Sequence, residues 1–564
     1  MIIKKDILII LFLTILLIFP LKSESSTNIS NFRTVDSADQ ETIKQKQKQL
    51  LEESQKQQNL GLDLKESKPK QQVKSNKNLP CQFVDIIEIE GSEYLSKEKQ
   101  AFLIKPYIFK CLTIEDINYL VKDISTYYME KGYITSRAFL TQQDISKGNL
   151  TILVVEGKVD NILMNGENSL ALKMAFPNLI GKILNLRDIE QGLEQLNIMP
   201  SYQVRINIKP SKKTGYSDII LTKKYSKSPV SISFGLDNDG NKNSGENQIN
   251  TNLRLDNILN LADLWTFYAN KDTDFSHDHK TWYIISGVSI PYGYWLFNYQ
   301  YVKNETLQHI TIENFKFPYE IKGESHNLRA NRTLYRDGKQ KLGFNIGLTK
   351  RKTENIIGNT KLLSSSDLST FNIGLNYSSN LLGSYFSFNP TYTRGLDVFN
   401  ATKDDNKFKD APKSQFNKIS VSASYYKFLM SDIYYLTSFY GQYSPTSLFS
   451  SERVSLGSQY SIRGFKEQSI MGNTGGYWRN EFNWKLKQTP KIGNLSLNSS
   501  LDVGWIKRER LRGSDGGNLV GASLGLTLNN SIGSHSITLG KPLKYPQYLK
   551  PDTWVIYWST SFDF

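Results

Sequence analysis

The sequence predicts a mostly β protein in which residues 227–564 form a 16-stranded transmembrane β-barrel behind two α+β domains. Composition is the first indication: the 564-residue chain has 31 Tyr and 28 Phe, yet its mean hydropathy is only −0.42. A chain rich in aromatic residues but hydrophilic on average suits strands with one face in lipid and the other in water. The second indication is a period of two that begins near residue 230 and continues to the C-terminus.

Segments of alternating polarity, joined by short turns and longer polar loops, carry the barrel prediction. The last segment is the sharpest, with one face formed by Trp554, Ile556, Trp558, Thr560, Phe562 and Phe564. There are about 17 such segments, and because single-chain bacterial barrels close with an even number we exclude the weakest, residues 309–315. A soluble all-β repeat protein is the alternative, but the chain lacks a regular blade period.

Residues 1–25 are predicted to be a secretory signal peptide, with Lys4 and Lys5 before an apolar core at residues 7–19. That core is too short for a comfortable membrane span, and no later segment has 18 consecutive apolar residues. We therefore expect no transmembrane helix. An exported chain without one is either soluble or a barrel.

Residues 26–58 are expected to contain one polar helix, since positions 39–58 are dominated by Gln, Lys and Glu. Such a helix has no apolar stripe to bury, so it is either disordered in water or enclosed in a polar cavity. Residues 59–80 are predicted to be a flexible periplasmic linker.

The two α+β domains are an internal repeat of the order strand, helix, helix, strand, strand. The first, residues 81–158, is expected to have strands at 83–89, 136–140 and 150–155 and helices at 95–109 and 113–128, the second helix capped by Thr113 and Asp116. The second, residues 159–226, is expected to have strands at 159–164, 202–208 and 217–221 and helices at 169–176 and 185–196.

The chain has two cysteines, Cys81 and Cys111, both in the first domain. An even pair in an oxidising compartment favours a disulfide, which would close a loop of about 30 residues and contribute on the order of 3–4 kcal/mol. Two buried free thiols are the alternative. The wide spacing without nearby His argues against a zinc site.

The net charge of +15 fits a solvated lumen and loops, and we see no compact basic module of the kind that binds nucleic acid. No catalytic constellation is evident among the five His, and neither a G-x-S-x-G motif nor a P-loop is present. His277 and His279 flank Asp278, where a polar turn is a better interpretation than a metal pair. We therefore predict no enzyme activity, no cofactor and no metal.

Three stretches resemble the two-partner secretion transporters, or hemolysin activator/secretion proteins, of the outer-membrane assembly superfamily. Residues 132–159 resemble the first polypeptide-transport-associated (POTRA) domain, and residues 234–265 resemble the first hairpin region of the family's barrel. The most specific stretch is Ser461-Ile462-Arg463-Gly464-Phe465, which matches the superfamily's VRGF motif with Ile in place of Val. The resemblance implies an N-terminal plug helix, two POTRA domains and a 16-stranded barrel.

The resemblance also implies roles for single residues. Ile462, Arg463, Gly464 and Phe465 would lie at the tip of a loop in the lumen, and Asp502 would pair with the loop arginine. The residues themselves agree: Leu501, Val503 and Trp505 share one face, so Asp502 faces the lumen if these three face lipid. A confined carboxylate favours a cation, and Arg offers a bidentate fork. The superfamily further implies a C-terminal insertion signal, formed here by Trp554, Ile556, Trp558, Phe562 and Phe564.

By this resemblance we expect a transporter in the outer membrane of a Gram-negative bacterium, in contact with its lipid and with the POTRA domains in the periplasm. It would bind one large secreted exoprotein in extended form through those domains and translocate it in two-partner (type V) secretion. The exoprotein would be an adhesin, a hemolysin or a heme-related protein, and the barrel assembly machinery would act during biogenesis. The alternatives are an outer-membrane insertion factor and a diffusion pore.

Overall fold

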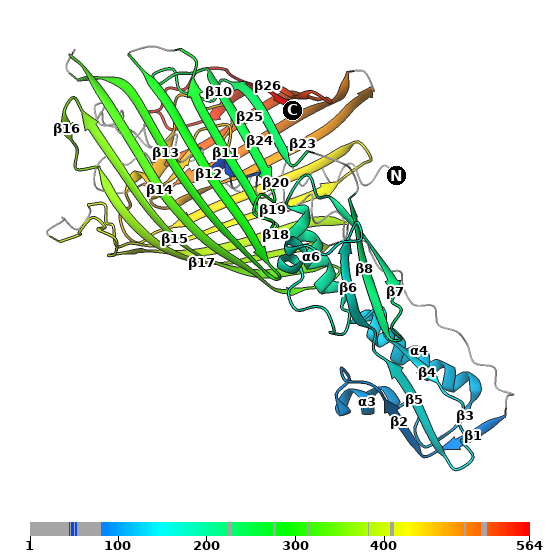
Figure 1. The fold of residues 1–564 in the computed structure, drawn as a ribbon. Helices are drawn as coiled ribbons and strands as arrows, with labels where there is room; N and C mark the ends of the chain where they lie inside the picture. Colours follow the sequence, from blue (N-terminus) through cyan, green and yellow to red (C-terminus); the bar gives the residue numbers. More distant parts are fainter. Residues whose placement is uncertain are drawn as a thin grey trace.

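The computed structural model describes residues 44, 47–49, 51–52, 80–223, 228–274, 278–312, 315–381, 383–405, 411–489, 492–508 and 516–564. The predicted signal peptide, and the predicted linker apart from Pro80, lie outside the described residues. Figure 1 shows a barrel above two small α/β domains that follow one another away from it. Within the described ranges, no helix combines the length and the apolar character needed to cross a membrane.

The first domain contains one three-stranded sheet, a separate strand pair and two helices. Its elements are β1 (Cys81–Val84), β2 (Ile86–Glu90), α3 (Lys97–Ile104), β3 (Lys110–Thr113), α4 (Ile114–Glu130), β4 (Arg137–Leu140) and β5 (Asn149–Val155). The sheet order is β2-β5-β4, and β1 pairs with β3. Thr113 caps α4, and Asp116 bonds back to it, as the sequence predicts. The buried face of α4 includes Ile117, Leu120, Ile124 and Tyr128.

Three details of this domain differ from the sequence-based expectation. The strand expected at 83–89 is two strands, because β1 pairs antiparallel with β3 whereas β2 pairs parallel with β5. The helix expected at 95–109 is confined to α3, two residues before Pro106, which disfavours helix at the residue preceding it. The chain then turns through Phe109, whose φ of 57° lies in the left-handed region, into the unexpected strand β3.

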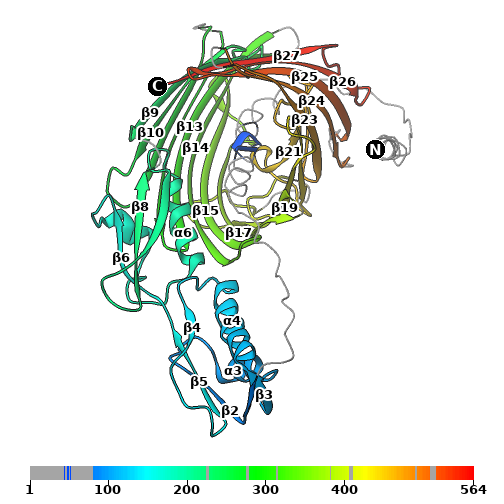
Figure 2. The same cartoon turned by 90° about the vertical axis from the view of Figure 1, so that its right-hand side faces the viewer.

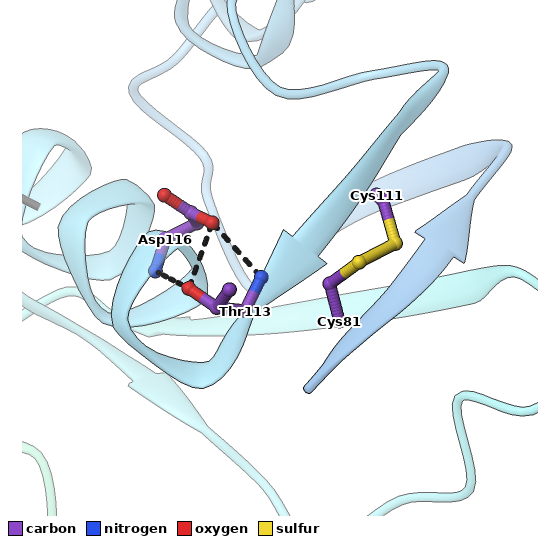
Figure 3. The surroundings of a disulfide bond; sticks show 4 residues. All are labelled: Cys81, Cys111, Thr113 and Asp116. Carbon is purple, nitrogen blue, oxygen red and sulfur yellow. Dashed lines mark hydrogen bonds between the residues drawn. A yellow bond between two sulfur atoms is a disulfide. The ribbon is translucent and has the colours of Figure 1, made fainter. Parts of the chain in front are cut away.

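A disulfide between Cys81 and Cys111 ties β1 to β3, with the two Cα atoms 5.3 Å apart (Figure 3). The strand register places Phe83 opposite Cys111 and Cys81 opposite Thr113, so the bridge runs diagonally across the pair. An isolated pair of short strands is only marginally stable, and β1–β3 is such a pair. The disulfide therefore stabilises it.

The second domain follows the predicted order. Its elements are β6 (Lys158–Met164), α5 (Leu170–Ala175), α6 (Leu186–Asn197), β7 (Val204–Pro210) and β8 (Tyr216–Lys223), with sheet order β6-β8-β7. Its apolar core, which includes Leu172, Ile189 and Ile219, also takes in Ala262 and Leu264 from the start of the third barrel strand. The second domain therefore shares an apolar core with the barrel and packs directly against it.

The described part of the C-terminal region forms a closed barrel of 16 main strands, which confirms the predicted fold class. The strands are β9 (Val230–Asp237), β10 (Gln248–Asp256), β11 (Leu264–Asp272), β12 (Lys280–Tyr292), β13 (Trp295–Ile312), β14 (Phe315–Arg336), β15 (Gln340–Ile357), β17 (Ser366–Leu381), β18 (Ser384–Leu396), β19 (Asn417–Phe428), β20 (Ile433–Tyr443), β23 (Gly475–Thr489), β24 (Gly493–Ile506), β25 (Gly517–Asn529), β26 (Gly533–Lys544) and β27 (Val555–Asp563). A two-residue strand, β16 (Thr360–Lys361), extends one hairpin. The excluded segment 309–315 is no separate strand, since it spans the β13–β14 hairpin.

The barrel closes where β27 pairs with β9, from Ser559 opposite Asp237 to Asp563 opposite Ser233. The last strand shows the predicted alternation: Trp554 and Ile556 are each 52% exposed on the outside, whereas Val555 is 5% exposed on the lumen side. An apolar outer face and a polar interior are what a membrane barrel requires.

Because the disulfide is the main constraint on the β1–β3 pair, replacing both Cys81 and Cys111 by Ser should loosen that pair locally. We expect a loss of about 3 kcal/mol, or on the order of a hundredfold faster amide exchange in β1 and β3. Hydrogen exchange with mass spectrometry on the full-length protein would measure this, with barrel peptides as the internal control. Unchanged protection of β1 and β3 would show that packing alone holds them.

Candidate functional site in the barrel lumen

A long segment between β20 and β23 folds back into the barrel. It contains a short 3-10 helix, η1 (Ser450–Glu452), and a hairpin of β21 (Val454–Leu456) with β22 (Ile470–Gly472). We call residues 444–474 the lumen loop. Its buried apolar side chains pack with residues of the barrel wall in one cluster: Val454, Leu456, Ile462, Phe465, Ile470, Tyr477, Ile506, Leu519 and Leu549. A polar barrel interior thus contains a local apolar core that fixes this loop.

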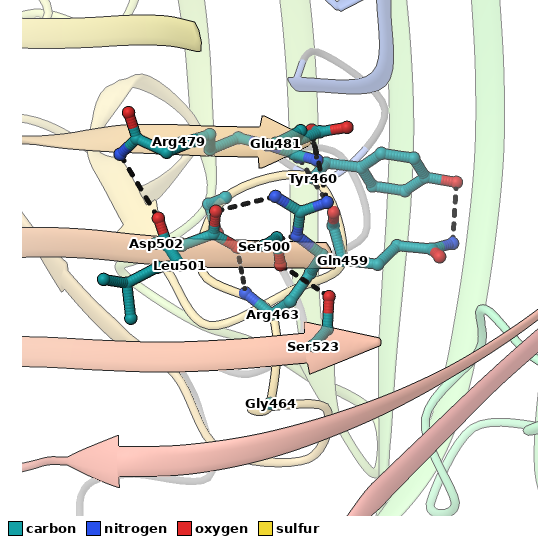
Figure 4. A network of polar contacts seen from close by, with 12 residues as sticks. Gln459, Tyr460, Arg463, Gly464, Arg479, Glu481, Ser500, Leu501, Asp502 and Ser523 are labelled. Carbon is teal, nitrogen blue, oxygen red and sulfur yellow. Dashed lines mark hydrogen bonds and ion pairs between the residues drawn. The ribbon is translucent and has the colours of Figure 1, made fainter. Parts of the chain in front are cut away.

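The tip of the lumen loop is anchored by Arg463 (Figure 4). Its Nε and Nη2 donate to the two carboxylate oxygens of Asp502, each at 2.7 Å, and its backbone N–H donates to the same carboxylate at 3.1 Å. Asp502, on β24, is completely buried. Burial works to lower the pKa of the guanidinium, but Asp502 and Glu481 hold that pKa above its ordinary value. The loop arginine is therefore always charged and bidentately paired.

Two further charges on the wall complete this network, and sequence reasoning missed them both. Glu481, on β23, lies 3.2 Å from Arg463 Nη1 and accepts a 2.9 Å hydrogen bond from Arg479. Arg479 also donates to the backbone oxygen of Gln459 at 2.9 Å. The β-strand period places Arg479 and Glu481 on one face of β23, and this spacing was the available signal.

Small residues on the wall let the loop tip approach the strands. A side chain on Gly521 of β25 would overlap the carbonyl oxygen of Arg463, and Gly464 lies against the backbone of Lys541 on β26. Gly464 has a φ of 98°, a conformation that favours glycine. Ile462 and Phe465 on either side are fully buried, and Tyr557 donates to the Phe465 carbonyl at 3.1 Å.

The base of the lumen loop is fixed by a second buried carboxylate. Glu452, 8% exposed, accepts from Lys418 on β19 at 2.6 Å and pairs with Arg351 on β15. Glu452 thereby connects the loop to strands β15 and β19, whereas Arg463 connects it to β24. The loop is held near its start and at its tip by ion pairs whose charges are shielded from water.

A helix occupies the lumen beside this loop. The described residues Lys44, Gln47, Lys48, Gln49, Leu51 and Glu52 are all helical, and Figure 2 shows their blue ribbon inside the ring of strands. Gln47 donates to the Ser455 carbonyl at 2.8 Å and accepts from Ser458 at 3.1 Å. Lys44 donates to the Asp239 carbonyl at 3.1 Å. The sequence left two possibilities for the polar N-terminal helix, disorder in water or enclosure in a polar cavity. The contacts of these described residues agree with enclosure.

The second α/β domain is joined to the barrel by α6. Gln195 donates to the carbonyl of Gly293 in the β12–β13 turn at 3.1 Å. Glu194 accepts from Arg336 at 3.0 Å and from Lys341, both beside the β14–β15 turn. Burial works to raise the pKa of Glu194, but Lys341 and Arg336 outweigh it and hold that pKa below its ordinary value.

The other residues singled out from the sequence lie apart from the lumen. His279 lies 2.9 Å from Asp274 in the connection between β11 and β12, and His277 lies outside the described residues. Cys81 and Cys111 belong to β1 and β3, and both strands lie at the end of the first domain away from the barrel (Figure 1). Of the proposed insertion-signal residues, Phe564 is 73% exposed and contacts Phe234 across the closing seam, with ring centroids 6.1 Å apart.

A 16-stranded barrel with a lumen-anchored loop, an internal helix and two packed α/β domains defines the class of outer-membrane protein transporters with POTRA domains. The family model of the haemolysin secretion/activation protein ShlB/FhaC/HecB matches residues 215–528. Two POTRA models match residues 83–157 (ShlB-type) and 158–210. The chain belongs to this haemolysin secretion/activation family.

Comparisons with individual relatives support the same family. The chain is 38% identical to the outer membrane transporter CdiB of Dickeya dadantii (strain 3937), over 93% of this chain and 94% of that protein. It is 29% identical to the hemolysin transporter protein HpmB of Proteus mirabilis, over 79% of this chain and 80% of that protein. The solved structure of CdiB from Escherichia coli matches with a TM-score of 0.90 and 37% identity, over 96% of this chain and all of that one.

The chain is therefore an outer-membrane transporter of two-partner secretion, acting with a secreted exoprotein, and its POTRA domains lie in the periplasm. The family evidence supports this function over that of an insertion factor.

Because Arg463 and Asp502 are both buried, removing one partner should cost more than removing both. Asp502→Leu alone leaves an uncompensated buried charge and should cost about 3–5 kcal/mol, whereas the Arg463→Met/Asp502→Leu double variant should recover at least half of that. Urea unfolding followed by tryptophan fluorescence measures the loss. Arg254→Met, at an exposed arginine on β10, is the control and should change stability by less than about 1 kcal/mol. If the stability losses of Asp502→Leu alone and Arg463→Met alone add up to the loss of the double variant, the two residues are not coupled.

Since the pKa of Glu194 is held below its ordinary value of 4.5, the attachment of the second domain to the barrel should weaken in acid. The contribution is fully present above about pH 4.5 and is lost as the pH falls through the folded-state pKa. The distributions of distances between spin labels on α6 and on the barrel, measured by electron paramagnetic resonance, should stay narrow from pH 7 to pH 4.5 and broaden as the pH falls through the lowered pKa of Glu194. Glu194→Gln should give broad distances at every pH, and a distribution that stays narrow in acid would refute the assignment.

Proposed function

We propose that this transporter captures its exoprotein as an extended chain on the open edges of the POTRA sheets and passes it through the barrel once the lumen helix has left. The observation that carries the first step is the sheet order of the POTRA domains. In the order β2-β5-β4, strands β2 and β4 each have one partner among the described residues, so each presents an unpaired edge. An unfolded secreted chain has a free backbone that can add to such an edge.

Side chains on the first POTRA domain support β4 as the recognition edge. Phe139 and Leu140, at its end, are 49% and 37% exposed, although large apolar side chains usually lie inside a domain. Backbone pairing would provide affinity, and these two apolar side chains, one on each face of the strand, would provide preference for particular segments of the partner.

The lumen contacts support the second step. In its described residues the helix is held by polar contacts such as those of Gln47 with Ser455 and Ser458. Polar contacts of this kind exchange readily with water or with another polar chain, because their net free energy is small. The lumen loop, held by buried ion pairs, would stay as the helix leaves. Folding of the partner outside the cell would drive transport.

The relatives support one kind of exoprotein over the others. Identity is 38% to a CdiB transporter but 28% to the hemolysin transporter protein ShlB of Serratia marcescens. This difference favours a partner of the kind that CdiB transporters handle over a hemolysin or a heme-related protein. We further propose that the apolar face formed by Trp554, Ile556, Trp558, Phe562 and Phe564, in and beside β27, is recognised by the barrel assembly machinery during biogenesis.

The recognition edge can be tested by co-expression with the cognate exoprotein. Phe139→Asp should lower the exoprotein secreted into the medium by about tenfold, because a charge replaces an apolar contact of the recognition edge. Phe102→Asp is the matched control: Phe102 is 68% exposed in the same domain but lies on α3, away from the edge. Heat-modifiable gel mobility confirms a folded barrel in both. Equal secretion by the two variants would exclude β4 as the recognition edge.

A further inference from the structure

We infer that the barrel wall holds a binding site for a lysine or arginine side chain, filled at rest by Lys48 of the lumen helix and taken over by cationic residues of the exoprotein as it passes. The inference rests on the proposed function only in its second half, the passage of a chain through this lumen. The site itself is built from residues of β9, β11 and the lumen loop.

Two tyrosine rings form the sides of the site. The Lys48 ammonium lies 5.6 Å from the ring centroid of Tyr268, on the lumen face of β11, and 6.0 Å from that of Tyr460, in the lumen loop. Both distances are within the range in which an ammonium is attracted to a ring face. Tyr268 is itself stacked on Tyr283 at 5.5 Å, which fixes the plane of its ring.

Two carboxylates of the wall supply the negative charge. Asp237, at the end of β9, and Asp239, two residues on, both attract the Lys48 ammonium. Asp239 is held by hydrogen bonds from the Tyr460 hydroxyl and the Gln459 amide. Burial, followed by the nearby Asp239, raises the pKa of Tyr460 well above its ordinary value, so its hydroxyl keeps the proton that it donates.

The helix binds this region as a ligand would, through one face. Lys44 and Lys48 are four residues apart and therefore project from the same side of the helix. Lys44 donates to the carbonyl of Asp239 and, at 3.1 Å, to the side chain of Asn241. Glu52, the third carboxylate that attracts Lys48, belongs to the helix itself and leaves with it. The charge that remains on the wall is that of Asp237 and Asp239.

Departure of the helix removes the Lys48 ammonium from beside these carboxylates. Asp237 is 6% exposed at rest, and a shielded carboxylate is stabilised by a nearby cation. A cavity of about 310 Å³ adjoins the site, lined by residues that include Lys48, Leu51, Tyr460 and Arg463, so a side chain entering the lumen has room to reach it. The matching ligand is an extended polypeptide that carries lysine or arginine.

The resting half of the inference is tested by single-channel recording of the full-length protein in planar lipid bilayers. Lys48→Met should raise the fraction of time in the open state by about tenfold. Methionine has no ammonium group, so the attraction to the tyrosine rings and to the carboxylates is lost. Lys48→Arg should stay near the wild type. Tyr268→Leu should raise opening, whereas Tyr268→Phe, which keeps the ring, should change it much less. Wild-type opening in Lys48→Met would overturn the site.

The second half of the inference, binding of a passing chain, is tested with the Lys48→Met protein and two synthetic extended peptides. The peptides differ only in having Lys or Gln at their central positions. The Lys peptide should interrupt the current for about fivefold longer than the Gln peptide, and Asp239→Asn should abolish that difference. Equal interruptions by the two peptides would refute exchange of cations at this site. These recordings need no exoprotein, so failed secretion with intact peptide discrimination would count against the proposed function alone.

Discussion

In hydrocarbon every backbone N–H and C=O needs a partner, so the strands of this chain have to close into a ring. Closure depends on the β9–β27 seam, where strands from the two ends of the barrel region meet. The side chain of Asn238 extends the seam: it donates to the Ile556 carbonyl at 2.9 Å and accepts from the Trp558 N–H at 2.8 Å. A closed wall of alternating strands necessarily points its polar faces inward. A wide polar interior follows, and the rest of the structure serves to fill it and to control it.

Two kinds of contact fill that interior, and their strengths differ. The lumen loop is fixed by Arg463 on Asp502, by Glu452 on Lys418 and by an apolar cluster of its own. The helix is held by amide and ammonium contacts with the loop and the wall. Buried ion pairs are costly to break because each leaves a charge without a partner, whereas a lysine between tyrosine rings can be exchanged for another cation. The loop is thus suited to a permanent role and the helix to a replaceable one.

The period of two in the sequence predicted the barrel, its start at Val230 and the outward face of the last strand, because alternation is imposed by lipid on one side and water on the other. Capping chemistry placed the start of α4 correctly. The strand β3 could not be predicted, since its four residues are fixed by the disulfide and by pairing with β1 rather than by a pattern of their own. At the lumen, the motif indicated Arg463, and strand alternation placed Asp502 on the inner face. Glu481 could have been placed on the inner face by its spacing from Arg479 on the same strand. The positions of Glu452, Tyr268 and Tyr460 depend on which distant segments meet inside the barrel, and a single sequence does not contain that information.

The claim on which the account most depends is that the helix lies against the lumen loop at rest and has to leave for the exoprotein to pass. It can be measured directly by pairing Gln47→Cys with Ser458→Cys, two positions joined by a 3.1 Å hydrogen bond. With the introduced pair oxidised, exoprotein secretion should stop, and it should resume when a reductant opens the cross-link, while each single variant secretes normally. Normal secretion from a fully cross-linked protein would contradict the account.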